Sequence, residues 1–303
     1  MPTKPPLLML VKNPGLNALD HVGDVYDLRF EPGPGIRAAI CGGSGVDAAT
    51  MDAAPDLEII ALVGVGYDVI DVGHARAKGI AVTNTPDVLT DDVADLAIGL
   101  MLAIARRLPA NDLYVRQGRW VADGPPPLAR RASGRRIGVL GLGRIGQAIA
   151  QRAQPFASQI GYFSRRPKNE GTDYLYFDDP IALADWADIL IVAVSGGPAT
   201  SGLVDRKVIE ALGPDGTLIN VARGSVVDEP ELVAALQQGR LGFAGLDVFA
   251  HEPHVPEGLL RLENAILLPH QGSATHEARR AMADLALANL AAFFAGEPLL
   301  TPV

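Results

Sequence analysis

Short β-forming runs alternate with helix-compatible segments along almost all of this 303-residue chain. The runs expected to form strands are Leu7–Val11, Ala38–Cys41, Ile59–Val63, Ile80–Val82, Ile137–Leu140, Gln159–Phe163, Ile189–Val194, Thr217–Val221, Gly245–Val248 and Ala265–Leu268. Strands that alternate with helices are typical of parallel sheets joined by crossover helices. The chain is therefore predicted to be an α/β protein.

A glycine-rich turn stands in the middle of this pattern. Its sequence is Gly141-Leu142-Gly143-Arg144-Ile145-Gly146, between an expected strand and an expected helix. Gly141 permits a tight turn, Gly143 lets the backbone approach a pyrophosphate, and Gly146 lets the helix pack closely on the strand. The turn predicts a dinucleotide site. Because it lies in mid-chain, the sheet that it opens is a second one, and two doubly wound parallel-sheet domains are expected.

The end of the next expected strand indicates which dinucleotide is bound. An acidic residue about twenty positions after the glycine motif hydrogen-bonds the ribose of NAD, whereas arginine accommodates the 2′-phosphate of NADP. Here that strand ends in Ser164-Arg165-Arg166. The prediction is NADPH or NADP⁺, with NADH bound more weakly.

The composition excludes several other classes of function. The net charge is -9, which argues against a nucleic-acid or anionic-membrane surface. The single cysteine, Cys41, cannot form an intramolecular disulfide. The most hydrophobic stretch, Leu96–Ala105, is shorter than the roughly 20 residues that span a bilayer. A cytoplasmic protein is expected.

Two longer helices and one loop are also expected. Asp91–Arg107 begins with acidic residues and ends with two arginines, which complements a helix dipole, and a second helix spans about Thr275–Phe294. The proline-rich segment between Trp120 and Ser133 is predicted to be a loop, with Trp120 as its anchor.

Charged side chains follow three successive strands expected in the second sheet. Arg223 follows the first, Asp247 and Glu252 the second, and His270 the third. Ligands of open α/β sheets bind beyond the carboxyl ends of the strands. An arginine, carboxylates and a histidine are therefore expected at one edge of the sheet.

These motifs, taken in order, resemble those of the D-isomer-specific 2-hydroxyacid dehydrogenase family. They are the glycine turn at 141–146, Val221-Ala222-Arg223-Gly224, Asp247-Val248-Phe249 through Glu252-Pro253, and Pro269-His270, with Val63-Gly64-Val65-Gly66-Tyr67-Asp68 and Val93-Ala94-Asp95-Leu96 in the first half. The resemblance covers nearly the whole chain. The segment Leu89–Asp95 is most similar to the glyoxylate and hydroxypyruvate reductases of the family.

The resemblance implies a flavodoxin-like substrate domain, residues 1–98 and 271–303, in which a Rossmann cofactor domain, residues 99–270, is inserted. It also implies a homodimer. Besides the glycine turn and Ser164-Arg165-Arg166, the family pattern implies that the cofactor contacts Ser195, Val221, Ala222, Asp247 and Gly272, with Asp247 at the nicotinamide end.

The chemistry of such a reaction accounts for the charged residues. Reduction of a 2-keto acid needs a hydride at the carbonyl carbon, a proton at its oxygen and a counter-charge for the carboxylate. Arg223 can hold the carboxylate and polarise the carbonyl, and His270 is an acid suited to neutral pH. Glu252 would favour the protonated ring. Backbone amides of Gly64, Val65 and Gly66 would bind the remaining carboxylate oxygens.

Some alternatives stay open at this point. The substrate is expected to be a small 2-keto acid such as glyoxylate or hydroxypyruvate, but a bulkier acid such as hydroxyphenylpyruvate is the nearest rival. The residues near Lys12, Asn13 and Cys41 do not settle the size of the pocket. A cofactor-sensing binding module like the corepressors that share this fold is an alternative of another class. No metal is expected, because His251 and His254 lack further ligands nearby.

Overall fold

The computed structural model describes residues 4–11, 19–168 and 173–303, and the chain divides into two compact units. Unit 1 consists of Met1–Leu89 and Ser273–Val303, and unit 2 of Thr90–Gly272. Helix α4 (Thr90–Ala105) thus belongs wholly to unit 2. The assignment of residues 1–98 and 271–303 to a substrate domain, and of residues 99–270 to a cofactor domain, stays a prediction.

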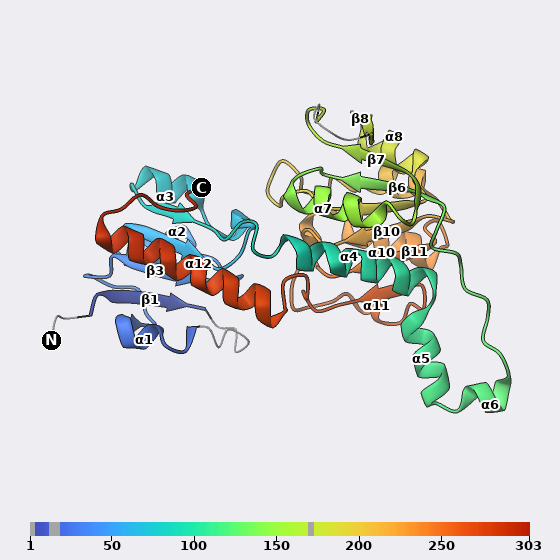
Figure 1. Cartoon of the computed structure of the whole chain (residues 1–303), viewed down its shortest axis with the longest axis horizontal. Helices are drawn as coiled ribbons and strands as arrows, with labels where there is room; N and C mark the ends of the chain where they lie inside the picture. The colour runs from blue at the N-terminus through green and yellow to red at the C-terminus, as the bar shows by residue number, and fades with distance from the viewer. Residues whose placement is uncertain (1–3, 12–18, 169–172) are drawn as a thin grey trace. The chain divides into compact units, whose positions relative to one another are not determined.

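Unit 1 is built on a parallel sheet, which in the described residues has the strand order β2-β1-β3-β4-β5. Its strands are β1 (Pro6–Leu10), β2 (Asp27–Arg29), β3 (Ala38–Cys41), β4 (Ile59–Leu62) and β5 (Ala81–Thr83), and its helices are α1 (Val22–Val25), α2 (Ala48–Ala53), α3 (Val72–Ala77) and α12 (His276–Ala295). The long helix α12 runs across the sheet (Figure 1). The Thr275 hydroxyl caps it by accepting a hydrogen bond from the Ala278 amide at 3.0 Å.

Unit 2 is built on a second parallel sheet, in which the described strands follow the order β12-β11-β10-β9-β6-β7-β8. They are β6 (Arg135–Leu140), β7 (Ala157–Phe163), β8 (Leu175–Phe177), β9 (Ile189–Val192), β10 (Thr217–Asn220), β11 (Phe243–Leu246) and β12 (Ala265–Leu267). The strand order reverses at β6, which pairs with β7 on one side and β9 on the other. Such a switch point opens a ligand crevice at the carboxyl ends of the strands.

Helices cover both faces of the unit 2 sheet, as a doubly wound fold requires. They are α4, α7 (Arg144–Ala153), α8 (Pro180–Trp186), α9 (Arg206–Leu212), α10 (Glu229–Gln237) and α11 (Glu257–Leu260). A Cβ at Gly245 would come within 2.7 Å of Ile104 on α4, whereas its neighbours Ala244 and Leu246 join the core cluster that contains Leu232 of α10. Successive residues of a strand face opposite sides, so α4 and α10 cover different faces.

Two helices, α5 (Leu108–Arg116) and α6 (Arg119–Asp123), form an arm that projects from the body of unit 2 (Figure 1). The interpretation of Trp120 as a loop anchor is wrong, because this residue lies in α6 and is 61% exposed. The two arginines expected in the last turn of α4 also lie beyond it. Arg107 adopts a left-handed conformation, with φ of 51°, and redirects the chain into α5.

The expected fold class is confirmed, and each of the ten expected strands is present. The two strands that the sequence did not reveal, β2 and β8, are both three residues long and lie at sheet edges. Leu175 and Tyr176 of β8 are 37% and 38% exposed, so this strand lacks the buried apolar run that identifies the central strands. Among the described residues, no helix is both long and apolar enough to span a membrane.

Candidate functional site

The glycine turn lies between β6 and α7, and each glycine has a different environment. Gly141 has φ of +104°, and a Cβ there would meet Val194 at 2.7 Å. A Cβ at Gly146 would lie 1.9 Å from the Gly141 carbonyl oxygen, so the helix packs directly on the turn. By contrast, the Cβ position of Gly143, the N-cap of α7, has no atom within 4 Å apart from those of its own chain neighbours. The turn therefore presents open space and a helix N-terminus at the same point, which suits a phosphate.

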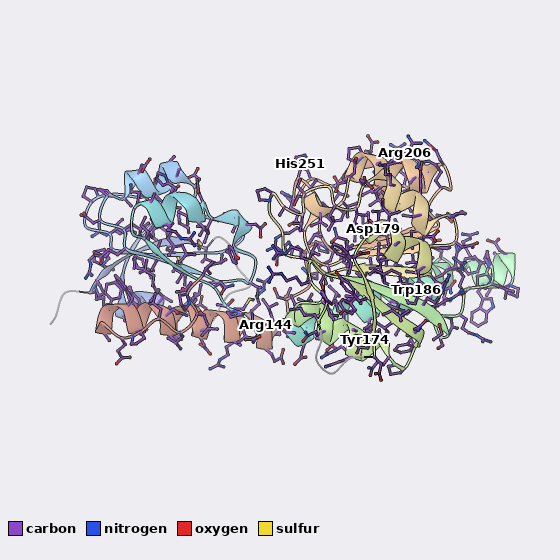
Figure 2. The ribbon with its side chains drawn as sticks, turned by 90° about the horizontal axis from the view of Figure 1, so that it is seen from above. Arg144, Tyr174, Asp179, Trp186, Arg206 and His251 are labelled. Atoms are coloured by element: carbon purple, nitrogen blue, oxygen red, sulfur yellow. The ribbon has the colours of Figure 1, made fainter. Side chains whose placement is uncertain are left out.

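The other three residues of the turn differ in how deeply they are buried. Leu142 is buried and contributes to the core, whereas Arg144 begins α7 with an exposed side chain (Figure 2). Ile145 is half-buried.

The strand β7 brings Ser164, Arg165 and Arg166 next to the glycine turn. Phe163 at the end of β7 pairs with Leu140 of β6, and its carbonyl accepts a hydrogen bond from the Gly141 amide at 2.9 Å. Both arginine side chains are exposed, and within the described residues neither has an ion-pair partner. Two cationic groups thus lie beside the open end of the glycine turn.

Arg223 is presented by a turn that buried Asn220 stabilises at the end of β10. The Asn220 side chain accepts a hydrogen bond from the Ala222 amide at 3.0 Å and donates one to the Arg223 carbonyl at 2.9 Å. Gly224 then packs so tightly on the following loop that a Cβ would lie 1.9 Å from the carbonyl carbon of Phe249. The Arg223 turn therefore abuts the loop that carries Glu252.

Glu252 and His270 form a hydrogen-bonded pair. The Glu252 Oε2 atom lies 2.7 Å from His270 Nδ1, and Oε1 accepts a hydrogen bond from the Phe249 amide at 3.1 Å. Burial by itself would raise the pKa of Glu252, but the hydrogen bond from His270 and the positive charges of His270 and Arg223 lower it overall. The glutamate is thus ionised at neutral pH, and Nδ1 of the imidazole carries the shared proton.

Asp247 holds the His270 loop against the end of β11. Its side chain is 1% exposed, and its two oxygens accept hydrogen bonds from the Gln271 amide at 2.6 Å and the Gly272 amide at 2.7 Å. The Asp247 carbonyl accepts the His270 amide at 2.9 Å, and His270 has a positive φ of 54°. Burial raises the pKa of Asp247, against the opposing effect of the two amide hydrogen bonds.

The remaining residues predicted to contact the cofactor also lie at this edge of the sheet. Val221 and Ala222 are buried directly after β10, and Gly272 is buried against Asp247. Ser195 is exposed in the loop after β9, where its carbonyl accepts a hydrogen bond from the Thr200 hydroxyl at 2.6 Å. All these residues therefore follow carboxyl ends of strands in unit 2.

Two structural supports of the site were not identified from the sequence. One is Asn220, described above. The other is Glu229, a buried carboxylate in the first turn of α10 that accepts a hydrogen bond from the Ala250 amide at 3.0 Å. Asp228 and Pro230 around Glu229 mark the start of a helix, but no sequence signal connects its side chain to a loop 21 residues away.

In unit 1 the Gly64-Val65-Gly66 segment follows β4. The Gly64 amide donates to the Thr85 hydroxyl at 2.9 Å, so it already has an acceptor. The Val65 amide has none among the described residues. Of the three amides predicted to bind a carboxylate, Val65 is the candidate that the local structure favours. Lys12 and Asn13, near which pocket size was considered, lie outside the described residues.

The histidines other than His270 do not form a metal site in the described part of the chain. His251 and His254 face each other across a turn closed by a 2.8 Å hydrogen bond, and His251 lies at the surface of its unit (Figure 2). Over residues 4–11, 19–168 and 173–303, no group of three or more potential ligands could hold a metal ion.

Comparison with known proteins identifies the family. Residues 98–272 match the family model of the D-isomer specific 2-hydroxyacid dehydrogenase, NAD binding domain. The chain is 55% identical over 269 residues to a hydroxyphenylpyruvate reductase of Plectranthus scutellarioides, covering 88% of this chain and 85% of that one. It is 54% identical, with the same coverage, to glyoxylate/hydroxypyruvate reductase A of Arabidopsis thaliana.

A solved structure is similar over the whole length. The NADPH-dependent glyoxylate/hydroxypyruvate reductase of Sinorhizobium meliloti, in complex with NADP and malonate, has a TM-score of 0.94 and 45% identity, covering 99% of this chain and 97% of that one. The fold, the matched model and these relatives define an oxidoreductase of 2-hydroxy acids. The chain belongs to the D-isomer-specific 2-hydroxyacid dehydrogenase family.

Proposed function

We propose that this protein uses NADPH to reduce small 2-keto acids, glyoxylate and hydroxypyruvate, to 2-hydroxy acids. The observation that carries the proposal is the 2.7 Å contact between Glu252 and His270 on the same strand edge as Arg223 and the glycine turn. A proton donor, a fixed cation and a phosphate-binding turn at one edge are what this reduction needs.

His270 acts as the acid. Because Nδ1 is held by Glu252, Nε2 is the ring nitrogen that can give its proton to the carbonyl oxygen of the substrate. The carboxylate of Glu252 fixes the ring orientation through its contact with Nδ1. In the reverse direction the same nitrogen takes the proton from the hydroxyl group.

Arg223 binds the substrate carboxylate and polarises the carbonyl, since its planar guanidinium can donate two parallel hydrogen bonds. The Val65 amide is proposed to donate to the same carboxylate, as backbone amides in turns commonly do for anions. These groups orient the substrate without changing their own charge.

The described residues fit the cofactor. The open space at Gly143 and the N-terminus of α7 suit a pyrophosphate, and Arg165 and Arg166 suit a 2′-phosphate. When bound, the reduced cofactor supplies the hydride. The similarity to an NADPH-dependent reductase structure with NADP bound supports this choice over NADH.

Initial rates with a panel of 2-keto acids test the proposal directly. Glyoxylate, hydroxypyruvate and hydroxyphenylpyruvate are each assayed with NADPH and with NADH. We expect turnover of the two small acids, and a higher kcat/KM with NADPH than with NADH. Absence of turnover with both small acids would reject the substrate assignment.

A hydroxyphenylpyruvate reductase is the second candidate, favoured by the 55% identity to the Plectranthus enzyme. The same panel separates the two, because a pocket that accepts the aromatic ring gives its highest kcat/KM with that acid. The cofactor-sensing binding module is less well supported, since the relatives described above are named as reductases. It predicts NADPH binding with no turnover across the panel.

The proposal includes a homodimer, which the family resemblance implies. The arm formed by α5 and α6 carries apolar side chains that are more than half exposed; they are Leu108, Leu113, Val115, Trp120 and Val121. We propose that the partner subunit covers these side chains, because large exposed apolar patches mark interaction surfaces. Light scattering after size exclusion measures the mass, and a value near 31.8 kDa would reject the dimer.

A further inference from the structure

The two residues that follow β5, Asn84 and Thr85, hold the loop proposed to bind the substrate carboxylate. The Thr85 amide donates to the Gly64 carbonyl at 2.9 Å, and the Thr85 hydroxyl accepts from the Gly64 amide at 2.9 Å. The Asn84 side-chain amide donates to the Val65 carbonyl at 2.9 Å. Two successive carbonyls of the loop are thereby fixed by neutral donors.

Fixing these carbonyls also fixes the amides that follow them. A peptide group is planar, so the direction of the Gly64 carbonyl sets the direction of the Val65 N–H. The Val65 carbonyl sets the Gly66 N–H in the same way. A hydrogen bond to a carbonyl also polarises the peptide group and makes its N–H a better donor. Asn84 and Thr85 therefore control the geometry on which carboxylate binding depends.

Asn84 is in turn held by Thr301, more than two hundred residues later in the chain. The Thr301 hydroxyl donates to the Asn84 carbonyl at 2.6 Å, and the Asn84 amide donates to the Thr301 carbonyl at 3.3 Å. The same hydroxyl accepts a hydrogen bond from the Asn289 side-chain amide at 2.9 Å. The Thr301 hydroxyl thus links Asn84 to helix α12.

Asn289 lies at the end of this series of hydrogen bonds and is itself held in place. Its side chain is fully buried, and its amide nitrogen donates to Thr301 Oγ1 and, at 2.9 Å, to the Leu285 carbonyl. Its oxygen accepts from the Leu300 and Thr301 amides at 3.0 and 3.2 Å. All four hydrogen-bonding positions of the side chain are filled, and a fully satisfied buried network holds a single geometry.

We propose that Asn84 and Thr301 are positioning residues for substrate, which hold the two peptide groups on either side of Val65 from the fixed point at Asn289. This inference rests on the proposed function, in which that loop binds the carboxylate of a 2-keto acid. Neither residue touches the reacting atoms. Their loss should therefore weaken substrate binding more than it slows the chemical step.

Thr301→Val tests the inference because it removes the hydroxyl and keeps the shape of the side chain. We expect the KM for the 2-keto acid and the inhibition constant of oxamate, a carboxylate that is not reduced, both to rise about tenfold. We expect kcat to change less than about threefold and the NADPH Kd not to change. Thr301→Ser, which keeps the hydroxyl, should restore the wild-type KM.

Asn84→Ala tests the second support of the loop. It removes the side-chain amide that donates to the Val65 carbonyl but keeps the backbone carbonyl that Thr301 contacts. The KM should rise while kcat changes less than about threefold, and an unchanged KM would overturn the role of the Asn84 side chain. This variant also carries the test by itself if Thr301→Val does not fold.

Thr83→Val is the matched control. Thr83 lies in β5 next to Asn84, and its buried hydroxyl has no hydrogen-bond partner within the described residues. This change should leave KM and the oxamate constant unchanged. If Thr301→Val behaves like Thr83→Val while the wild type reduces 2-keto acids, the positioning role is rejected and the function stands. If the wild type neither reduces 2-keto acids nor binds oxamate, the function itself is rejected and the positioning role with it.

Discussion

The loop after β4 in unit 1 and the loops after β10, β11 and β12 in unit 2 all follow carboxyl ends of parallel strands, but they differ in chemistry. The unit 1 loop presents backbone amides, held by the neutral side chains of Asn84 and Thr85. The unit 2 loops present a guanidinium, carboxylates and an imidazole, with Glu252 and His270 in direct contact.

The difference teaches how one fold class can serve two tasks. Backbone amides carry no charge that titrates, so the unit 1 loop needs only a fixed geometry. The unit 2 loops also need fixed protonation states, and burial, neighbouring charge and hydrogen bonds set these for Glu252 and Asp247. Changes in unit 2 should therefore alter catalysis and its pH dependence, whereas changes in unit 1 should alter binding or stability.

The largest effect is expected for His270→Ala. Loss of the proton donor should lower kcat by about 10³-fold, while the NADPH Kd stays within about twofold of wild type. Steady-state kinetics and a fluorescence titration with NADPH measure the two quantities. Turnover close to wild type would show that another group supplies the proton.

The second largest effect is expected on the preference for NADPH over NADH. Arg165→Ala combined with Arg166→Ala should raise the KM for NADPH about 30-fold and leave the KM for NADH within about threefold, because only NADPH carries the 2′-phosphate. Arg206→Ala, which removes an exposed arginine paired with Glu210 on α9, is the control and should alter neither. Equal effects on the two cofactors would reject phosphate recognition.

A smaller effect, but a diagnostic one, is expected for Glu252→Gln. The neutral amide replaces the charge-assisted hydrogen bond that holds His270 Nδ1 with a weaker one, so kcat/KM should fall about tenfold. Steady-state rates with NADPH measure it. A kcat/KM close to the wild-type value would mean that the charge of Glu252 is not needed to hold the ring.

The same variant should change how stability depends on acid. The pKa of Glu252 is lower in the folded protein than its ordinary value of 4.5. Its contribution to stability is therefore fully present above that ordinary value and is lost as the pH falls through the lower, folded-state value. Urea unfolding at pH 7 and at pH 4 should show a smaller acid-induced loss of unfolding free energy in Glu252→Gln than in wild type.

The smallest effect is expected in unit 1. Thr83→Val removes a buried hydroxyl that lacks a hydrogen-bond partner within the described residues, so the free energy of unfolding should rise by about 1 kcal/mol. Urea denaturation measures it, and kinetic constants should stay at wild-type values. A loss of stability would show that the hydroxyl has a partner in solution, such as a water molecule.

Local chain chemistry made the central strands and the glycine turn predictable. The ten strands found in advance are apolar runs bounded by turns. A side chain at Gly141 or Gly146 would obstruct the turn, whereas Gly143 leaves open space beside the helix N-terminus. The edge strands β2 and β8 were missed because partly exposed strands of three residues have no such signal. The exposed helices of the arm were missed beside a proline-rich segment that predicts only a loop.

The sequence by itself determined the α/β class, the dinucleotide turn and the order of the residues Arg223, Glu252 and His270 after successive strands. These features depend on residue type and on short spacings, which the chain carries locally. Only the tertiary structure decided which polar groups are paired. The contacts of Glu229 with Ala250 and of Thr301 with Asn84 join residues 21 and 217 positions apart, and such partners are selected by folding and packing and not by local pattern.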